Sequence, residues 1–259
     1  MTVPVALASS IDEEIALIAR RYGRANGVGM QILNLVGGQA ENLLERLPDS
    51  AKGQLESVTS AALARSARLA AESRGLVPDQ APWLNRALTA AMGAAGGAGG
   101  LPTALAELPV TTTVLMRVIQ GVAAEHGFDP ADEAVQADCV RVFAAAGPLA
   151  EDDGAETGFL AARVTLTGAT LHGLIARVAP RFAAVLGQKL AAQMVPVLGA
   201  AAGAAINYAY TSYYQDIAHV HFGLRRLARE RAVAETELTE RLRIAMAAAR
   251  AARSRPRAG

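Results

Sequence analysis

The sequence contains a single cysteine, Cys139, and only 4% aromatic residues. One cysteine excludes a small domain held together by disulfide bonds. The shortage of aromatic residues disfavours a β-sandwich or β-barrel, because those folds need aromatic and β-branched side chains where this chain has alanine. What is abundant is small and apolar: 52% of the residues are hydrophobic, and 24 of 259 are glycine. A chain with this much apolar surface is expected to be folded, either as a compact protein of closely packed helices or as a protein that touches a membrane.

Lysine and histidine are also scarce, and their positions exclude several common sites. The chain has two lysines, and neither follows the glycines of residues 93–100, so these glycines do not form a P-loop. They do not form a dinucleotide-binding turn either, because no strand is predicted before them and Pro102 comes directly after them. His219 and His221 are spaced so that they lie on different faces of a helix, which is unsuited to binding one metal ion. We therefore expect no metal and no cofactor.

Hydrophobic spacing and helix-capping residues predict an all-α protein, a compact bundle with glycine-rich, close-packed helical hairpins. Ser10 and Glu13 form a capping box, so a helix is predicted to begin there and to end before Gly23. Asp129 and Pro130 suit the cap and the first position of another helix. Further helices are predicted over residues 30–47 and 51–74, from Asp153 to about Val178, and from each of the prolines Pro180 and Pro196.

Two long stretches of the chain, residues 87–106 and 190–215, carry no charge. Each is long enough to span a membrane, but both consist largely of alanine and glycine and both contain a proline. Three arrangements stay open: a span, a hairpin buried in the protein core, and a hairpin that enters the membrane interface. The residues expected to make these close helix or membrane contacts are Gly96, Gly97, Gly99, Gly100, Gly199, Gly203, Tyr208 and Tyr210.

The net charge of +1 conceals a basic C-terminal end. From Arg225 onward ten arginines stand against four glutamates, which makes this end about +6 and the rest of the chain about −5. We expect this end either to meet an anionic membrane surface or to be an ordinary solvated helix with a frayed tail. Nucleic acid is not an expected partner, because no aromatic residues stand between the arginines. The candidate anion-binding residues are Arg225, Arg226, Arg229, Arg243, Arg250, Arg253, Arg255 and Arg257.

An acidic cluster after residue 150 is the best candidate for catalysis among the weak candidates that the sequence offers. Asp152, Asp153 and Glu156, together with His172, are the groups that a soluble hydrolase would use as acids and bases. The same carboxylates also suit the start of a helix, where they cap free amides and interact favourably with the helix dipole. Cys139 has apolar neighbours at helical spacing, so it is expected to be a buried side chain and not a nucleophile.

An ordered series of short motifs resembles the EcsC family of bacterial proteins. The series covers about residues 80–225 and comprises LPVTTT at 108–113, GFDP at 127–130, ETGFLAAR at 156–163, APRF at 179–182, PVLG at 196–199, GAAINY at 203–208 and QDIA at 215–218. The motif residues singled out, none with a known role, are Pro109, Thr112, Arg117, Glu156, Gly158, Arg163, Asn207 and Asp216. The resemblance implies membrane association and, as in some relatives, binding of phosphoinositides or other anionic lipids, and it supplies no catalytic residues.

The predicted organisation is a helical lead-in over residues 1–79, an EcsC-like helical core over 80–225 and a basic helix with a frayed tail over 226–259. The first residues have neither a basic start nor a sustained apolar run, so no signal peptide is predicted and a cytoplasmic protein at the inner face of the cell membrane is expected. The predicted function is a non-catalytic lipid-binding or adaptor module. Two alternatives stay open, a soluble enzyme and a scaffold that binds a membrane transporter.

Overall fold

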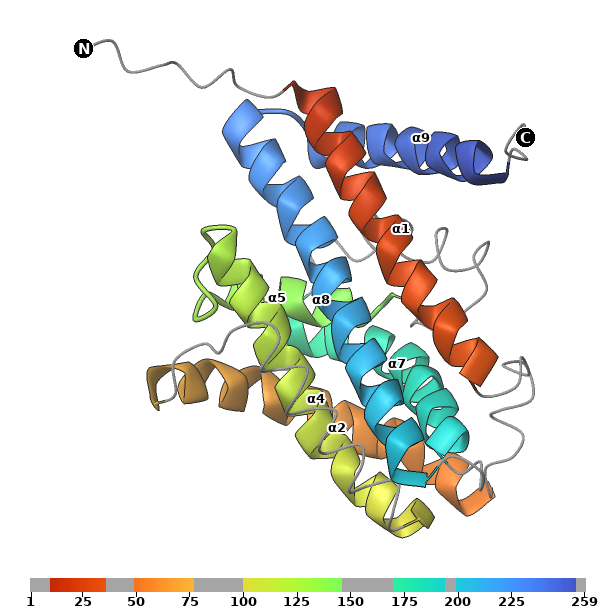
Figure 1. The fold of residues 1–259 in the computed structure, drawn as a ribbon. Coiled ribbons are helices and arrows are strands. Elements are labelled where there is room, and N and C mark those ends of the chain that lie inside the picture. The colour runs from red at the N-terminus through yellow and green to blue at the C-terminus, as the bar shows by residue number, and fades with distance from the viewer. Residues whose placement is uncertain (1–9, 36–48, 77–99, 146–169, 194–198, 255–259) are drawn as a thin grey trace.

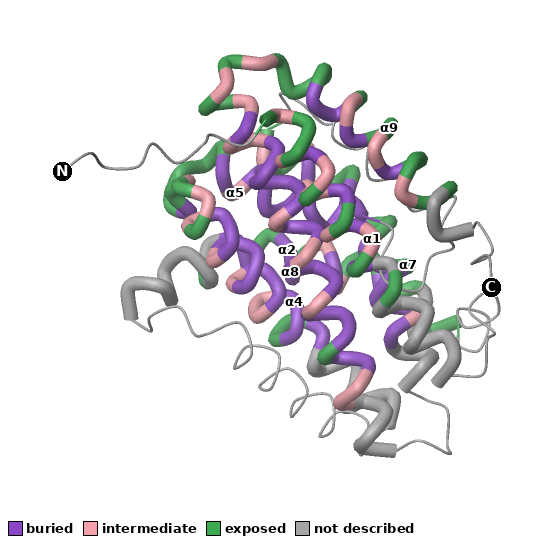
Figure 2. The backbone as a smooth tube through the Cα atoms, turned by 45° about the horizontal axis from the view of Figure 1, so that its top comes forward, coloured by how far each residue is buried: buried purple, intermediate pink, exposed green. Residues whose placement is uncertain are grey.

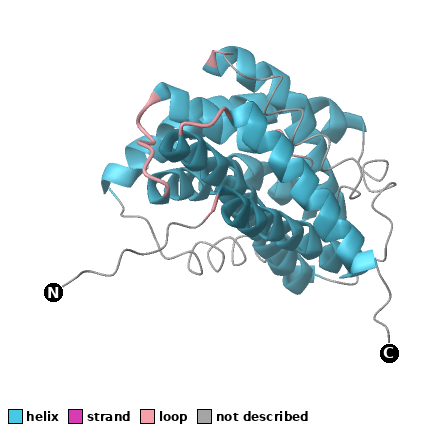
Figure 3. Cartoon of the chain, turned by 90° about the horizontal axis from the view of Figure 1, so that it is seen from above, coloured by secondary structure: helices cyan, strands magenta, loops and turns pink. Residues whose placement is uncertain are grey.

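The computed structural model describes residues 10–35, 49–76, 100–145, 170–193 and 199–254. Within these residues the chain forms seven α-helices and no strand (Figures 1 and 3), which confirms the predicted all-α class. The helices are α1 (Ile11–Leu35), α2 (Asp49–Leu76), α4 (Gly100–Glu125), α5 (Glu133–Val142), α7 (Leu171–Gln193), α8 (Gly199–Arg231) and α9 (Glu235–Ser254). None of the described helices combines the length and the apolar character that are needed to cross a bilayer.

The long helix α8 is central to the arrangement, because α1, α4, α5, α7 and α9 all contact it. Figure 1 shows α1 running antiparallel along α8, with α9 lying across the N-terminal end of α1. At the other end of the molecule α2 packs against α4 and α7. In Figure 2 the buried residues are concentrated along α8, α4 and α5. The core therefore surrounds α8, and α1 and α9 close it on one side.

One aromatic cluster organises the centre of this core. The rings of Phe143, Phe182 and Tyr214 contact one another at centroid distances of 4.4, 5.2 and 5.8 Å, and Tyr213 adjoins Tyr214. These four side chains are at most 1% exposed. Burial raises the pKa of the Tyr214 hydroxyl well above its usual value, so this group is neutral. Four aromatic side chains thus gather where α7 and α8 meet the C-terminal end of α5.

The start of α1 confirms the predicted capping box, but its predicted end is wrong. The Glu13 amide donates to Ser10 Oγ over 3.2 Å, and the Ser10 amide donates to Glu13 Oε2 over 2.8 Å. The helix then continues through Gly23 to Leu35. A glycine inside a helix costs about 1 kcal/mol. Burial of Tyr22, which is 1% exposed, and of its helical neighbours in the core outweighs that cost.

Two predicted helix starts, at Asp129 and at Pro180, are wrong. The helix expected from Asp129 begins at Glu133, because Asp132 Oδ1 accepts the Ala134 amide over 2.9 Å and so caps α5. Pro180 lies inside α7 and does not begin a helix. This proline is exposed, so water can satisfy the carbonyl that has lost its amide partner.

The uncharged stretch of residues 190–215 belongs to the protein core over the part that is described with its side chains. Tyr210 is 1% exposed and its hydroxyl donates to the Val185 carbonyl over 3.2 Å, whereas Tyr208 is 47% exposed. Gly100 begins α4, and Gly199 and Gly203 lie in the first turns of α8. Gly96, Gly97, Gly99 and the helix starts predicted at Asp153 and Pro196 lie outside the described residues.

The C-terminal segment is packed into the same core as the rest of the chain. Helix α8 passes through the predicted boundary between residues 225 and 226 without a break. Beyond it, α9 contributes Leu238, Leu242 and Met246 to the buried cluster. Removing this segment would therefore remove part of the core.

A buried carboxylate connects the helices near this boundary. Asp138 of α5 is 3% exposed and forms ion pairs with Arg141 of its own helix and with Arg225 of α8. His221 Nε2 lies 3.5 Å from Asp138 Oδ1. Arg225 Nε in turn lies 3.5 Å from Glu235 Oε1, at the start of α9. Asp138 thus joins α5 to α8 directly and to α9 through Arg225.

We expect Asp138→Asn to lower the free energy of unfolding by about 3 kcal/mol, because it leaves Arg225 without its buried carboxylate. Chemical denaturation followed by circular dichroism measures this loss. Glu133→Gln makes the same chemical change at an exposed position of α5 and should cost no more than about 0.5 kcal/mol. Equal losses in the two variants would show that Asp138 does not join the helices energetically.

Candidate functional site

A cleft with a volume of 240 Å³ lies between α1 and α8, next to the C-terminal end of α4. We call it the α1–α8 cleft. Helix α1 lines it with Glu14, Leu17, Ile18, Arg21 and Arg24, α8 with His219, Gly223 and Arg226, and the residue after α4 is His126. A Cβ atom at Gly223 would lie 3.5 Å from Ile18 Cδ1 and 3.7 Å from His126 Cε1, so any longer side chain there would fill the cleft.

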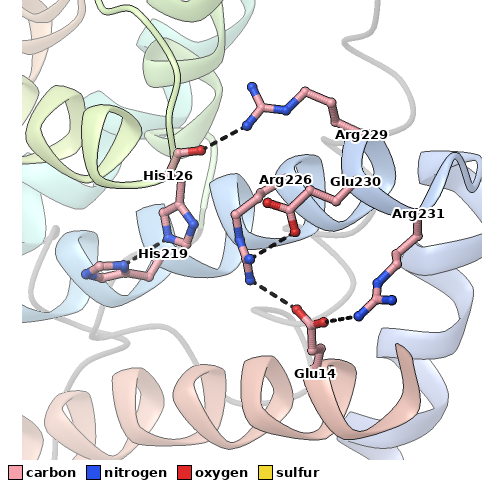
Figure 4. A network of polar contacts seen from close by, with 7 residues as sticks. All are labelled: Glu14, His126, His219, Arg226, Arg229, Glu230 and Arg231. Carbon is pink, nitrogen blue, oxygen red and sulfur yellow. Dashed lines mark hydrogen bonds and ion pairs between the residues drawn. The ribbon is translucent and has the colours of Figure 1, made fainter. Parts of the chain in front are cut away.

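The position of His126 is set by the turn that ends α4. Gly127 has a φ of 75°, which favours glycine, and the Phe128 amide donates to the Ala123 carbonyl over 3.0 Å to close the turn. Arg229 of α8 donates to the Gly127 carbonyl over 3.1 Å. It also donates to the His126 carbonyl over 3.3 Å (Figure 4). Its guanidinium also lies 4.6 Å from the centre of the Phe128 ring. These contacts hold the end of α4 against α8.

His126 and His219 form a hydrogen-bonded pair in the cleft. The distance between His126 Nε2 and His219 Nδ1 is 3.2 Å, and the two rings meet edge to face (Figure 4). Burial lowers the pKa of His126 to about 4, with a further contribution from Arg226 and Arg21. Burial lowers the pKa of His219 to about 3, assisted by Arg21, His126 and Arg24. Both rings are therefore neutral at pH 7.

Glu14 holds two arginines at one side of the cleft. Its Oε2 accepts from Arg226 Nη2 over 3.0 Å, and its Oε1 accepts from Arg231 Nη2 over 3.1 Å (Figure 4). Arg226 also donates to Glu230 over 3.1 Å. Charge is thus balanced at this side of the cleft.

At the other side, α1 presents arginines next to an apolar residue. Arg21 Nε lies 3.0 Å from Asp216 Oδ1. Arg24, one turn further along α1, is exposed and has no ion-pair partner among the described residues. Leu17, one turn before Arg21, is 57% exposed. Residues three or four apart share a helix face. Leu17, Arg21 and Arg24 therefore form a lip of the cleft that is both apolar and cationic.

Four of the eight predicted anion-binding arginines at the C-terminal end, Arg225, Arg226, Arg229 and Arg243, make contacts within the protein itself. Arg225 pairs with Asp138, Arg226 and Arg231 with Glu14, Arg241 with Glu237, and Arg243 with Glu240. Arg229 is bound to the turn after α4. Arg250 is exposed in α9, the side chain of Arg253 is not described, and Arg255 and Arg257 lie outside the described residues. Arg225, Arg226, Arg231 and Arg241 pair with carboxylates outside this segment, so part of its net positive charge is neutralised within the fold.

The other predicted site residues that the structure describes do not lie together in one site. Asp152, Asp153, Glu156, Gly158 and Arg163 lie outside the described residues, and His172 is exposed in the first turn of α7. Pro109 is exposed in α4, Thr112 is buried and donates to the Leu108 carbonyl over 2.8 Å, Arg117 is half-buried, and Asn207 is buried in α8. Cys139 is fully buried, as predicted. Among the described residues no three His, Cys, Asp or Glu side chains are placed to hold a metal ion.

Sequence reasoning did not find the α1–α8 cleft. His219 and His221 do lie on different faces of α8, as predicted, with His219 in the cleft and His221 beside Asp138. The partner of His219 is His126, which is 93 residues away and shows no local signal. The one available signal was the cluster of arginines at 20, 21 and 24, which follows the acidic first turn of α1.

The comparisons with known proteins identify the family of this chain. The sequence model of the EcsC protein family matches residues 39–227, more than half of the chain. The chain belongs to the EcsC protein family. The comparisons with curated proteins and with solved structures gave no match. In this EcsC protein the matched region includes α2, α4, α5, α7 and most of α8, while α1 and α9 lie outside it. The cleft therefore combines residues of the family region with residues of α1.

The neutral histidine pair predicts that stability falls as the solution is acidified. In the unfolded chain each histidine binds a proton near its usual pKa of about 6.5, whereas in the fold the pKa values are about 4 and about 3. Between these limits the unfolded state binds more protons, so the free energy of unfolding decreases as the pH falls. We expect a loss of about 1–2 kcal/mol from about pH 7 to about pH 5, reduced by solvent screening of the partly exposed His126.

Urea unfolding at the two pH values measures this loss. A variant that combines His126→Gln with His219→Asn keeps hydrogen-bonding groups in place of the two bonded ring nitrogens but has no imidazole, and should lose most of the pH dependence. His172→Gln, at an exposed position, should retain it. The prediction is wrong if the wild-type protein is equally stable at both pH values.

Proposed function

We propose that this EcsC protein is a non-catalytic peripheral membrane protein of the cytoplasmic membrane face, which binds an anionic phospholipid headgroup in the α1–α8 cleft. The observation that carries the proposal is the lip of the cleft, where exposed Leu17 stands on the same helix face as Arg21 and Arg24. Membership of the EcsC family is compatible with this role but does not establish it.

The chemistry of the cleft suits a phosphate group. Guanidinium groups donate charge-assisted hydrogen bonds to phosphate oxygens, and they can do so in a bidentate way. Arg24 is exposed, and Arg21 is held at the cleft by Asp216. The two histidines are neutral, so either ring can supply an N–H donor without carrying a charge into the cleft. A phosphodiester would thus meet donors on both α1 and the histidine pair.

The size and the lip of the cleft favour a headgroup over a whole lipid. Sites for complete small-molecule ligands usually measure about 300–1,000 Å³, and this cleft measures 240 Å³. The acyl chains would therefore stay in the bilayer. Leu17 would contact the boundary between headgroups and acyl chains, where apolar side chains of interfacial helices bind. This arrangement describes a protein that lies on the membrane.

The basic C-terminal end has a smaller part in this proposal than its sequence suggests. Arginines near an anionic surface contribute about 1 kcal/mol each, but only when their charge is available to the lipid. Arg225 and Arg226 are paired with buried or half-buried carboxylates. Deleting residues 226–259 would also remove core residues of α9, so deletion of residues 255–259 is the proper test of the tail.

A second candidate function, a scaffold for a membrane protein, is supported by one feature. A hollow of 310 Å³ lies between α2 and α4, and its lining is apolar except for Arg65 and Thr113. Leu69 and Val110 in this hollow are 39% and 53% exposed. If a partner protein binds there, Val110→Glu should abolish its co-purification from membranes solubilised in mild detergent and leave vesicle binding unchanged.

The main proposal predicts that Arg24→Glu weakens binding to phosphatidylglycerol vesicles by at least about tenfold, because it replaces attraction by repulsion at the cleft. Co-sedimentation with vesicles at low salt measures the affinity, and phosphatidylcholine vesicles give the uncharged reference. Arg177→Glu makes the same charge change at an exposed position of α7 and should have a much smaller effect.

Two results would contradict the proposal. One is a wild-type protein that does not bind phosphatidylglycerol vesicles at low salt. The other is an equal loss of binding in Arg24→Glu and Arg177→Glu, which would indicate attraction by overall charge and not by the cleft.

A further inference from the structure

The histidine pair of the α1–α8 cleft is built so that it can accept one proton without coming apart. With both rings neutral, a single proton lies between His126 Nε2 and His219 Nδ1, which are 3.2 Å apart. Adding a proton to one ring leaves an imidazolium that donates to the neutral partner, so the hydrogen bond is kept. If both rings were protonated, the N–H groups of His126 Nε2 and His219 Nδ1 would point at each other and the hydrogen bond would be lost. The pair therefore titrates as a unit that takes up one proton.

The charges around the histidine pair set the pH at which this proton binds. The groups that face the pair or its cleft are Glu14, Arg21 and Arg24 on α1, Asp216, Arg226 and Glu230 on α8, and Glu125 at the end of α4. In the empty cleft the arginines act against protonation of both rings. An anion bound beside Arg21 and Arg24 would offset this repulsion, and the protonated pair would in turn attract the anion.

We propose that the cleft binds its phosphodiester headgroup together with one proton, which His126 and His219 hold between them. This inference rests on the proposed function and adds to it the pH control of the same site. Since the complex holds one proton more than the separated molecules, binding strengthens as the pH falls. The affinity can increase by up to about tenfold for each pH unit. The increase ends near the pH at which the histidine pair is protonated even without a bound headgroup.

The test needs a ligand whose own charge does not change. The phosphodiester of phosphatidylglycerol keeps one negative charge from about pH 8 to about pH 5, so its vesicles serve as the probe at constant ionic strength. We expect the affinity of the wild-type protein to rise by at least about threefold over this range. The His126→Gln and His219→Asn double variant has no imidazole in the cleft, so whatever its affinity at about pH 8, that affinity should change little on acidification. His172→Gln, at an exposed position, is the matched control and should keep the wild-type response.

A second measurement does not depend on the variants folding well. Calorimetry of the wild-type protein in two buffers with different ionisation enthalpies counts the protons taken up on binding, which should approach one near pH 5–6. The same count with soluble glycerophosphoglycerol distinguishes the source of the ligand. Uptake with vesicles alone identifies the membrane lipid, and uptake with both shows that a free phosphodiester is sufficient. Either result supports the proposal.

The outcomes separate this inference from the function on which it rests. Binding to phosphatidylglycerol vesicles that does not vary with pH and involves no proton uptake overturns the inference and leaves the lipid-binding proposal intact. A pH response that the double variant retains overturns it as well, because the proton then binds elsewhere. Absence of binding at every pH overturns both.

Discussion

The buried carboxylate of Asp138 is the constraint on which the arrangement of helices depends. A charge that is 3% exposed must be neutralised locally, and here Arg141 and Arg225 do so with His221 beside them. This requirement turns one face of α8 toward α5. His219, two residues before His221, then lies on the opposite side of α8, where it faces α1. The orientation of the α1–α8 cleft thus follows from satisfying one buried charge on the far side of the helix.

The charges of this protein are arranged by tertiary contacts, so the net charge of a sequence segment does not show which charges are paired. Four C-terminal arginines, Arg225, Arg226, Arg231 and Arg241, are paired with carboxylates from elsewhere in the chain, for example Arg226 with Glu14 across 212 positions. These pairs bind the first helix to the last part of α8. Part of the basic C-terminal segment therefore helps to hold the helices together. The positive charge at the lip of the cleft comes instead from Arg21 and Arg24 of α1.

The cleft joins two parts of the chain that have different relations to the family. His126, His219 and Arg226 lie within residues 39–227, which match the EcsC family, while Arg21 and Arg24 lie on α1 outside that region. If the cleft is the binding site, its ligand is recognised by the family core together with a helix that the family model does not include. Both parts must then be present for the binding to be studied.

Features that arise from local patterns could be predicted from the sequence: the all-α class, the capping box at Ser10, the burial of Cys139 and the family. These follow from local hydrogen bonding, helical spacing and ordered motifs, all of which a linear sequence displays. Tertiary packing decided the rest, because burial against α8 outweighs the helix-breaking tendency of Gly23, and an exposed position lets α7 accept Pro180. It also decided the candidate site, since the pairs of His126 with His219, Arg225 with Asp138 and Arg226 with Glu14 are contacts between residues far apart in the chain. Interactions between distant residues carry no local pattern, so only the folded structure brings them together.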